Sequence, residues 1–261
     1  MRIEKRLVVI TGASSGIGLG LLQRFEKSGD KVIDISRHGR DFKCDVSDYS
    51  ALKKVMDEIY KRHGEIDIVI ACAGYGLNGA IEFVGEEEAK KQFDVNFFGT
   101  SNLCKYAIPK MKPNGKIIIM SSAMALLPVP YKAYYAASKV AVDRLAICLR
   151  MELSKTSIQV TSICPGDIKS DFTKNRVKQE TTNARYGDTI ANVIEQSEKK
   201  QSKRMPLEKA VNKIYKICEK KTLKSRYIIG LKYKLLNLAR KVFPKELMVG
   251  MTENLYLKKQ K

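Results

Sequence analysis

The strongest constraint on the fold is a regular alternation of short apolar runs with amphipathic stretches up to residue 165. Apolar, β-branched runs predict strands at 7–11, 31–36, 41–44, 66–72, 116–121 and 158–164, with a later one at 226–230. Helical spacing of hydrophobic residues predicts helices at 16–28, 49–63, 87–111, 131–154, 187–200 and 206–220. Strands that are apolar almost throughout are typical of a parallel sheet covered on both faces. The pattern therefore predicts one α/β domain over residues 1–261, with a Rossmann-like, doubly wound sheet of seven mostly parallel strands.

Two segments depart from this alternation. Residues 173–205 are polar and basic, and we expect them to form a substrate lid beside the carboxyl ends of the strands, or else a disordered surface loop. Residues 231–261 form a basic C-terminal extension, in which Leu231, Leu235, Leu238 and Val242 recur at helical spacing. The expected role of this stripe is packing on its own domain. Lining a substrate pocket and resting on a membrane surface are the alternatives.

The net charge of +20 is concentrated near the C-terminus. Residues 199–261 contain 19 Lys/Arg and 4 Asp/Glu, a local excess of 15, which leaves 5 for residues 1–198. Such a segment suits an anionic membrane, a nucleic acid or an acidic partner, or it keeps the protein in solution. Because the chain has no nucleic-acid motif, we expect no nucleic-acid partner and leave peripheral membrane contact open.

The remaining bulk features favour a cytoplasmic protein. No apolar run approaches the roughly 18 residues of a membrane span, and the first apolar run is too short for a signal peptide. The 6 cysteines form no C-x-x-C pair and have no histidine at zinc-ligand spacing. We therefore expect buried thiols in a reducing compartment, and no metal site.

The stretch TGASSGIG at 11–18 directly follows the first predicted strand and opens the first predicted helix. Glycines allow a tight turn and a close approach of the backbone to a pyrophosphate, whose charge then meets the positive end of the helix. The position of this turn indicates a dinucleotide site rather than a glycine-rich turn without a ligand.

The end of the second predicted strand bears on the choice between the two nicotinamide cofactors. A carboxylate here would bind the ribose 2′-hydroxyl of NAD(H), but the chain has Ser36, followed by Arg37. Asp34 falls two positions earlier, inside the strand. Because a guanidinium group can bind a phosphate through two hydrogen bonds, we expect NADP(H) to be favoured over NAD(H).

The stretch YYAASK at 134–139 places a tyrosine and a lysine one helical turn apart. On a helix, Tyr135 and Lys139 point in the same direction, and an ammonium group near a phenol lowers the phenol pKa towards neutrality. That pairing suits a general acid/base. An isolated pair of this kind is more typical of a half-buried tyrosine beside a solvated lysine, so the catalytic interpretation depends on the rest of the chain.

Several motifs, taken in order, resemble the short-chain dehydrogenase/reductase family, in particular its hydroxysteroid and retinol dehydrogenase-like members. They are TGASSGIG, CDVSD at 44–48, AG at 73–74, VNFFGT at 95–100, SS at 121–122, YAASK at 135–139 and PGDIKSDF at 165–172. The resemblance covers about residues 6–172. Cys72 departs from it, because the family usually has an asparagine there, and we expect one sheet-stabilising hydrogen bond to be lost. Ser170 replaces a commoner threonine and keeps the hydroxyl.

The resemblance implies four catalytic residues. Tyr135 would donate a proton to the carbonyl oxygen while the bound nicotinamide passes a hydride to the carbon, and oxidation would run in reverse. Ser122, 13 residues earlier, would hydrogen-bond the same oxygen. Lys139 would lower the tyrosine pKa and bind the nicotinamide ribose. Asn96 would support a water that connects Lys139 to solvent.

The resemblance also implies the cofactor contacts. Asp45 would accept a hydrogen bond from the adenine, and Ile168 and Ser170 would cover the carboxamide and the pyrophosphate. The whole expected set is Thr11, Gly12, Ser14, Ser15, Gly16, Ile17, Gly18, Ser36, Arg37, Asp45, Val46, Ala73, Gly74, Asn96, Tyr135, Lys139, Pro165, Gly166, Ile168 and Ser170. His38 and His63 are assigned no role.

The expected function is therefore an NADP(H)-dependent oxidoreductase that interconverts an alcohol and a ketone or aldehyde, with a bulky, steroid-like substrate favoured. A general small-carbonyl reductase and an NADP(H)-binding sensor or scaffold without turnover are the alternatives. The resemblance also implies a homodimer or homotetramer that associates through helices near 93–111 and 131–154.

Overall fold

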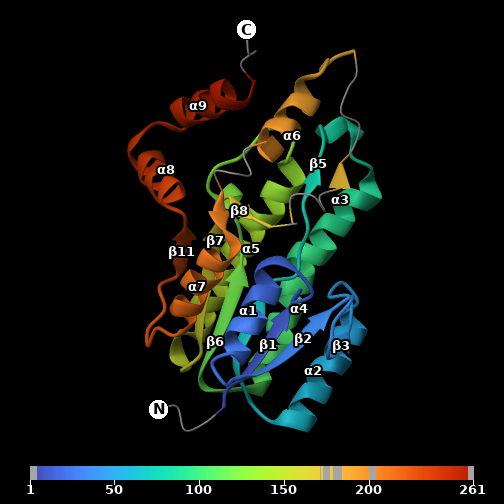
Figure 1. The fold of residues 1–261 in the computed structure, drawn as a ribbon, viewed down its shortest axis with the longest axis vertical. Helices are drawn as coiled ribbons and strands as arrows, with labels where there is room; N and C mark the ends of the chain where they lie inside the picture. Colours follow the sequence, from blue (N-terminus) through green and yellow to red (C-terminus); the bar gives the residue numbers. More distant parts are fainter. Residues whose placement is uncertain (1–4, 171, 173–176, 179–183, 200–203, 258–261) are drawn as a thin grey trace.

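The computed structural model describes residues 5–170, 172, 177–178, 184–199 and 204–257. Its centre is a sheet of seven strands, all paired in parallel (Figure 1). The strands are β1 (Leu7–Thr11), β2 (Lys31–Ser36), β3 (Phe42–Lys43), β4 (Ile66–Ala71), β6 (Met111–Met120), β7 (Gln159–Pro165) and β11 (Arg226–Ile229). All seven predicted strands are present, and the expected α/β class with a Rossmann-like sheet is confirmed.

The order of the strands positions the site. Across the sheet they run β11-β7-β6-β4-β1-β2-β3, so the chain builds outward from β1 in one direction and from β4 in the other. Such a reversal leaves a crevice at the carboxyl ends of the two central strands, where doubly wound proteins bind ligands. The glycine-rich turn after β1 lies at this reversal.

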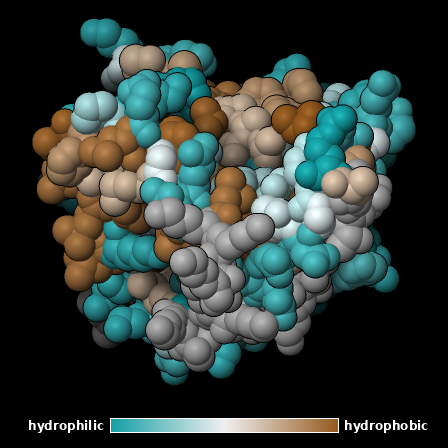
Figure 2. Space-filling model, turned by 90° about the horizontal axis from the view of Figure 1, so that it is seen from above, coloured by the Kyte–Doolittle hydropathy of each residue, from teal (hydrophilic) through white to brown (hydrophobic). Residues whose placement is uncertain are grey.

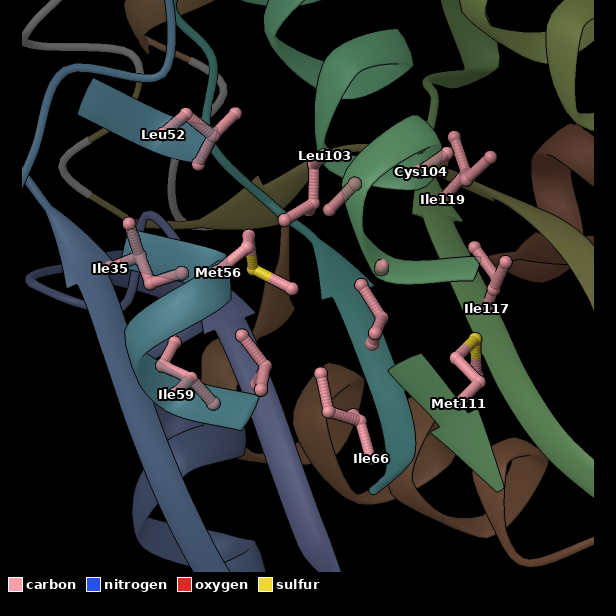
Figure 3. Packing of buried hydrophobic residues seen from close by; sticks show 14 of the residues in the cluster. Ile35, Leu52, Met56, Ile59, Ile66, Leu103, Cys104, Met111, Ile117 and Ile119 are labelled. Atoms are coloured by element: carbon pink, nitrogen blue, oxygen red, sulfur yellow. The ribbon is translucent and has the colours of Figure 1, made fainter. Parts of the chain in front are cut away.

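One face of the sheet is covered by α2 (Tyr49–His63), α4 (Gly99–Ala107) and α5 (Ala133–Glu152). Their apolar side chains interdigitate with every second residue of the strands, as Figure 3 shows for Met56 beside Ile35. The N-terminus of α2 is capped by Asp48, whose side chain accepts a hydrogen bond from the Ala51 N–H.

The opposite face is covered by α1 (Gly16–Glu26) and α7 (Leu207–Cys218). Phe25 of α1 and Tyr215 of α7 meet edge to face, with ring centroids 4.9 Å apart. These helices pack on the strand residues that alternate with those of the first face, such as Val8 and Ile10. The two-sided burial explains why the strands are apolar almost throughout.

The helix predicted at 87–111 is not continuous. It comprises α3 (Glu86–Phe93), a π-helical turn (Asp94–Phe98), α4 and a 3-10 turn (Ile108–Lys110), after which β6 begins at Met111. The Thr100 hydroxyl, in the first turn of α4, donates to the Asn96 carbonyl of the π-helical turn, 2.8 Å away. Single π-helical turns are common at functional sites, and this one carries Asn96.

The last third of the chain adds elements above the carboxyl ends of the strands (Figure 1). They include α6 (Thr189–Lys199), α8 (Leu231–Val242) and α9 (Lys245–Leu257), of which α9 was not predicted. Two short parallel pairs join distant segments: β5 (Leu77–Asn78) with β9 (Val177–Lys178), and β8 (Ile168–Lys169) with β10 (Met205–Pro206). Three stretches of the predicted lid, 173–176, 179–183 and 200–203, lie outside the described residues.

Among the described residues, no helix is both long enough and apolar enough to cross a membrane. Small 3-10 turns complete the chain at Ile81–Phe83, Ala123–Ala125 and Leu153–Lys155.

Candidate active site

A cavity of about 580 Å³ opens at the carboxyl ends of the central strands. It collects most of the residues that the sequence predicted. Those lining it are Gly12, Ser14, Ser15, Gly16, Ile17, Gly18, Ser36, Arg37, Asp45, Val46, Ala73, Gly74, Ser122, Tyr135, Lys139, Pro165, Gly166, Ile168 and Ser170. Thr11 and Asn96 are the two predicted residues that do not line it, and both are almost fully buried behind the wall.

The glycine-rich turn brings β1, β4 and α1 into close contact. A Cβ on Gly12, whose φ is +70°, would lie 2.7 Å from Ala73 Cα, and a Cβ on Gly18 would lie 2.2 Å from the Gly12 carbonyl oxygen. The Thr11 hydroxyl accepts hydrogen bonds from the Cys72 and Ala73 N–H groups. Backbone packed this closely, with the N-terminus of α1 lining the cavity, fits the pyrophosphate of a dinucleotide.

The end of β2 keeps its carboxylate away from the cavity. Asp34 is 2% exposed, and its side chain accepts hydrogen bonds from the Ser36 hydroxyl and the Arg40 N–H. The Arg40 guanidinium pairs with Glu26 and Asp41. Arg37, by contrast, is exposed and lines the cavity. The cation rather than the carboxylate therefore faces the cavity here.

Asp45 stands beside Val46 at the same end of the cavity. Its carboxylate accepts hydrogen bonds from the N–H and the hydroxyl of Ser47. Burial works against its charge, but the Ser47 hydrogen bonds and the positive charges of Arg37 and Lys91 hold the pKa of Asp45 below its ordinary value. The carboxylate is thus an ionised acceptor at neutral pH.

Tyr135 and Lys139 lie on the first turns of α5, and both line the cavity. Tyr135 is 6% exposed, and its ring lies 5.9 Å from that of Phe172. The Lys139 ammonium donates to the Met120 carbonyl at 3.0 Å, and burial lowers the pKa of Lys139 from 10.5 to about 8. The helical spacing therefore brings a phenol and a desolvated amine into one site.

Ser122 and its neighbour fix the wall opposite α5. The Ser122 hydroxyl oxygen accepts from the Met124 N–H, which leaves its hydrogen for an oxygen in the cavity. Ser121 donates to the Lys139 carbonyl at 2.8 Å and so connects the end of β6 to the turn of α5 that carries Lys139. This positioning role of Ser121 was not predicted, although Ser121 stands beside Ser122 in the SS motif.

Asn96 acts one layer behind the cavity. Its side-chain amide accepts from the Tyr75 N–H and donates to the Tyr75 carbonyl and to the Ser138 hydroxyl. Ser138 in turn donates to the Tyr135 carbonyl. Asn96 therefore connects the strand end after β4 to the turn of α5 that carries Tyr135.

Cys72 lines the cavity on the side of Lys139. Burial raises the pKa of its thiol to about 11, so the group is neutral. Among the described residues no group of His, Cys, Asp and Glu side chains could hold a metal ion.

The cavity has a cover that the motifs did not reveal. Tyr233 of α8 packs against Gly166 so closely that a Cβ there would lie 2.1 Å from the ring. The Tyr233 hydroxyl donates to Asp167 at 2.5 Å, and burial together with this carboxylate raises the tyrosine pKa. Arg240 donates to the Leu126 carbonyl at 2.8 Å. These contacts fix α8 over the carboxyl end of β7.

The prediction that the apolar stripe of α8 packs on its own domain is wrong. Leu231, Leu235, Leu238 and Val242 do not pack on their own domain, because they are 60–73% exposed. The reason is that the opposite side of the helix, with Tyr233 and Leu236, is the one that lines the cavity. α9 adds further lining residues, which are Met248, Met251, Thr252, Leu255 and Tyr256.

A parallel sheet that reverses its order at a glycine-rich turn, with a cavity above that point, defines the class of doubly wound nucleotide-binding proteins. A family model described as short chain dehydrogenase matches residues 6–181. The chain therefore belongs to the short-chain dehydrogenase/reductase family, whose members are oxidoreductases, and the resemblance inferred from the motifs is confirmed.

Two relatives show how far the similarity extends. The 3-ketodihydrosphingosine reductase of Bacteroides thetaiotaomicron is 34% identical over 210 residues, which are 76% of this chain and 78% of that protein. The probable short-chain type dehydrogenase/reductase VdlC of Helicobacter pylori is 33% identical over 252 residues, which are 91% of this chain and 93% of that protein.

A solved structure with the same fold is the short-chain dehydrogenase of Burkholderia cenocepacia in complex with NADP. The TM-score is 0.74 at 22% identity, and the match covers 99% of this chain and 100% of that one.

Proposed function

We propose that this protein is an NADPH-dependent reductase of a bulky lipophilic ketone, with a long-chain keto compound as the leading substrate class. The observation that carries the proposal is that Ser122, Tyr135 and Lys139 line one cavity with the glycine-rich turn. A reductase needs a proton donor and a cofactor site within reach of one carbonyl group.

Each side chain has a role in the proposed reaction. The bound nicotinamide supplies a hydride to the carbonyl carbon. Ser122 holds the carbonyl oxygen with its hydroxyl hydrogen, and Tyr135 gives that oxygen its proton. Lys139, when charged, favours the tyrosinate that remains. Asn96 is a positioning residue, because its amide holds Tyr75 and Ser138 rather than the cavity.

The chemistry of the cavity wall supports a lipophilic substrate. Many of the other lining residues are apolar, and they come from five separate segments of the chain: Leu77, Met124, Leu127, Val129, Phe172, Val177, Leu236, Met248, Met251 and Leu255. A relative named for 3-ketodihydrosphingosine supports a long-chain ketone over the steroid first expected from the motifs. Apolar walls of this extent favour a ligand with a long hydrocarbon part.

The preference for NADP(H) is supported by the end of β2. Arg37 faces the cavity, while Asp34 is occupied by Ser36 and the Arg40 N–H. A 2′-phosphate would therefore meet a guanidinium group and no competing carboxylate from this strand. NADP in the Burkholderia cenocepacia relative is consistent with this preference.

The decisive experiment follows NADPH oxidation by its absorbance, with 3-ketodihydrosphingosine, a steroid ketone and a small ketone as separate substrates. The test variant is Tyr135→Phe, and Tyr134→Phe is the matched control because Tyr134 does not line the cavity. We expect turnover with the long-chain ketone, kept by Tyr134→Phe and reduced by about 10³-fold or more in Tyr135→Phe.

Two results would contradict the proposal. Turnover of the small ketone alone would indicate a general carbonyl reductase. Tight NADPH binding without turnover of any substrate would favour a sensor or scaffold.

Arg37→Ala tests the cofactor preference, with Arg40→Ala as control. We expect Arg37→Ala to lower kcat/KM for NADPH by about tenfold or more without changing that for NADH. An equal loss with both cofactors would contradict the role given to Arg37.

The proposal includes a cytoplasmic protein that associates as a homodimer or homotetramer. All six cysteines are free, which is consistent with a reducing compartment. Exposed Phe98, Val140 and Met151 lie on or beside α4 and α5, the helices expected to mediate association. Light scattering would test the oligomeric state.

A further inference from the structure

The two C-terminal helices expose an unusual concentration of apolar side chains. Among the described residues, 17 large hydrophobic side chains are exposed, and 10 of them lie in residues 231–257. Figure 2 shows hydrophobic side chains gathered on the side of the molecule where α8 and α9 lie. We call this set the C-terminal apolar surface: Leu231, Leu235, Leu238, Val242, Phe243, Leu247, Val249, Met251, Leu255 and Leu257. Exposed patches of this kind mark interaction sites.

The α8 part of this surface cannot be buried by rotating the helix. Tyr233 is held by Asp167 and packs on Gly166, and Arg240 is bound to the Leu126 carbonyl. These contacts commit the inner side of α8 to the cavity. Leu231, Leu235 and Leu238 recur every three or four residues on the other side, where they remain 60–73% exposed.

The charges around the surface identify its partner. Residues 231–257 contain five cations, Lys232, Lys234, Arg240, Lys241 and Lys245, against Glu246 and Glu253. The net charge of this segment is thus +3, and that of the whole chain is +20. A second copy would bring the same positive charge to the contact, whereas an anionic bilayer brings the opposite charge and an apolar interior.

The surface is continuous with the opening of the cavity. Met251 and Leu255 of α9 are 53% and 52% exposed, and they also line the cavity. Contact of this apolar surface with acyl chains would therefore bring the part of the cavity lined by α9 to the level of the lipid. Basic helices with one exposed apolar side bind to bilayers in this manner without crossing them.

We propose that α8 and α9 dock the protein on an anionic membrane surface and admit its substrate to the cavity directly from the lipid. Membrane docking stands on the surface alone, and the entry of substrate rests on the proposed function.

The test uses the full-length protein and two sets of sedimented vesicles, one of phosphatidylcholine alone and one of phosphatidylcholine mixed with phosphatidylglycerol. The docking variant combines Leu231→Gln, Leu235→Gln and Leu238→Gln, none of which lines the cavity. The control variant combines Tyr49→Gln, Tyr60→Gln and Ile81→Gln, which are exposed elsewhere. We expect binding to the anionic vesicles that weakens with salt, a loss of about tenfold or more in the docking variant, and no loss in the control.

Activity measurements separate docking from the proposed function. With the long-chain ketone embedded in anionic vesicles, the docking variant should turn over more slowly than the wild type, whereas both should act equally on the ketone in detergent. Vesicle binding without any turnover would leave docking standing and overturn the proposed function. Equal vesicle binding by wild type and docking variant would overturn docking. If the wild type formed dimers but bound no vesicles, and the docking variant formed no dimers, the surface would be a contact between two copies of the chain.

Discussion

The floor and the cover of the cavity are built in opposite ways. The floor, formed by the ends of β1, β2 and β4 and the start of α1, holds its position through backbone contacts such as that of Gly18 with the Gly12 carbonyl. The cover, formed by α8 and α9, is held by side chains such as Tyr233 and Arg240 and leaves many apolar residues exposed. A floor of this kind tolerates almost no change, whereas the cover can change its sequence while it keeps its place.

The contrast predicts its largest effect at Gly18→Ala. Alanine normally stabilises a helix, but here the added Cβ would lie 2.2 Å from the Gly12 carbonyl oxygen. We expect a loss of about 2–4 kcal/mol in the free energy of unfolding and a loss of NADPH binding of about 100-fold. Urea denaturation and fluorescence titration measure the two quantities. The control is Gly85→Ala, because a Cβ there meets nothing within 4 Å.

Gly166→Ala tests the contact between α8 of the cover and the chain segment that follows β7. The added methyl group would overlap the Tyr233 ring and displace α8, so we expect KM for a long-chain ketone to rise about tenfold. Adding Tyr233→Ala should restore part of the loss, because it makes room for the methyl group. If the rise in KM of the double variant equalled the combined rises of the two single variants, the two sites would act independently. The contact between Gly166 and Tyr233 would then not be the cause.

Lys139→Met, on α5 in the cavity wall, tests what the burial of a charged side chain costs in stability. Because burial lowers the pKa of Lys139 in the folded protein to about 8 from 10.5, the charged lysine destabilises the fold below pH 8. This cost declines as the pH rises from 8 to 10.5, where the unfolded chain also loses the proton. We therefore expect Lys139→Met to abolish turnover. Without cofactor, we expect it to raise the free energy of unfolding at pH 7 by about 1 kcal/mol, which is the net gain once the loss of the hydrogen bond to Met120 is subtracted. Denaturation at pH 7 and pH 10.5 should show the gain only at the lower pH.

The smallest effect is expected in the cover, at Gly250→Ala in α9. A Cβ at this position meets nothing within 4 Å, so only the helix propensity changes. We expect a gain of about 0.5–1 kcal/mol and unaltered turnover, measured by thermal denaturation and by the NADPH assay. A destabilised protein would show that the cover is packed as tightly as the floor.

The same contrast explains what the sequence could predict. All seven strands were found because burial on both faces makes each of them an apolar run, and Asp34 was placed correctly inside its strand. The floor residues were found because a tight backbone turn requires glycines at fixed spacing. Of the predicted set, only Thr11 and Asn96 lie behind the cavity wall, where the side chains of both accept hydrogen bonds from nearby backbone N–H groups.

The features that were missed depend on distant contacts. The Tyr233 hydroxyl and Asp167 are 66 residues apart in sequence, and Arg240 and Leu126 are 114 apart. Nothing near α8 indicates which of its two apolar sides faces inward, so the stripe of leucines was assigned to the wrong side. The π-helical turn that carries Asn96 has the hydrophobic pattern of an ordinary helix and could not be distinguished from one.

Gly230 is where the chain leaves the sheet, with a φ of +112° that other residues rarely adopt. Every strand in the described part of the chain precedes this glycine, and the 31 residues beyond it are the extension that contains the cover. In evolutionary terms, the final segment is free to diverge, because changes in it leave the sheet and the glycine-rich turn intact. Substitutions in this segment can therefore alter the apolar lining of the cavity, while the backbone contacts around Gly12 stay as they are.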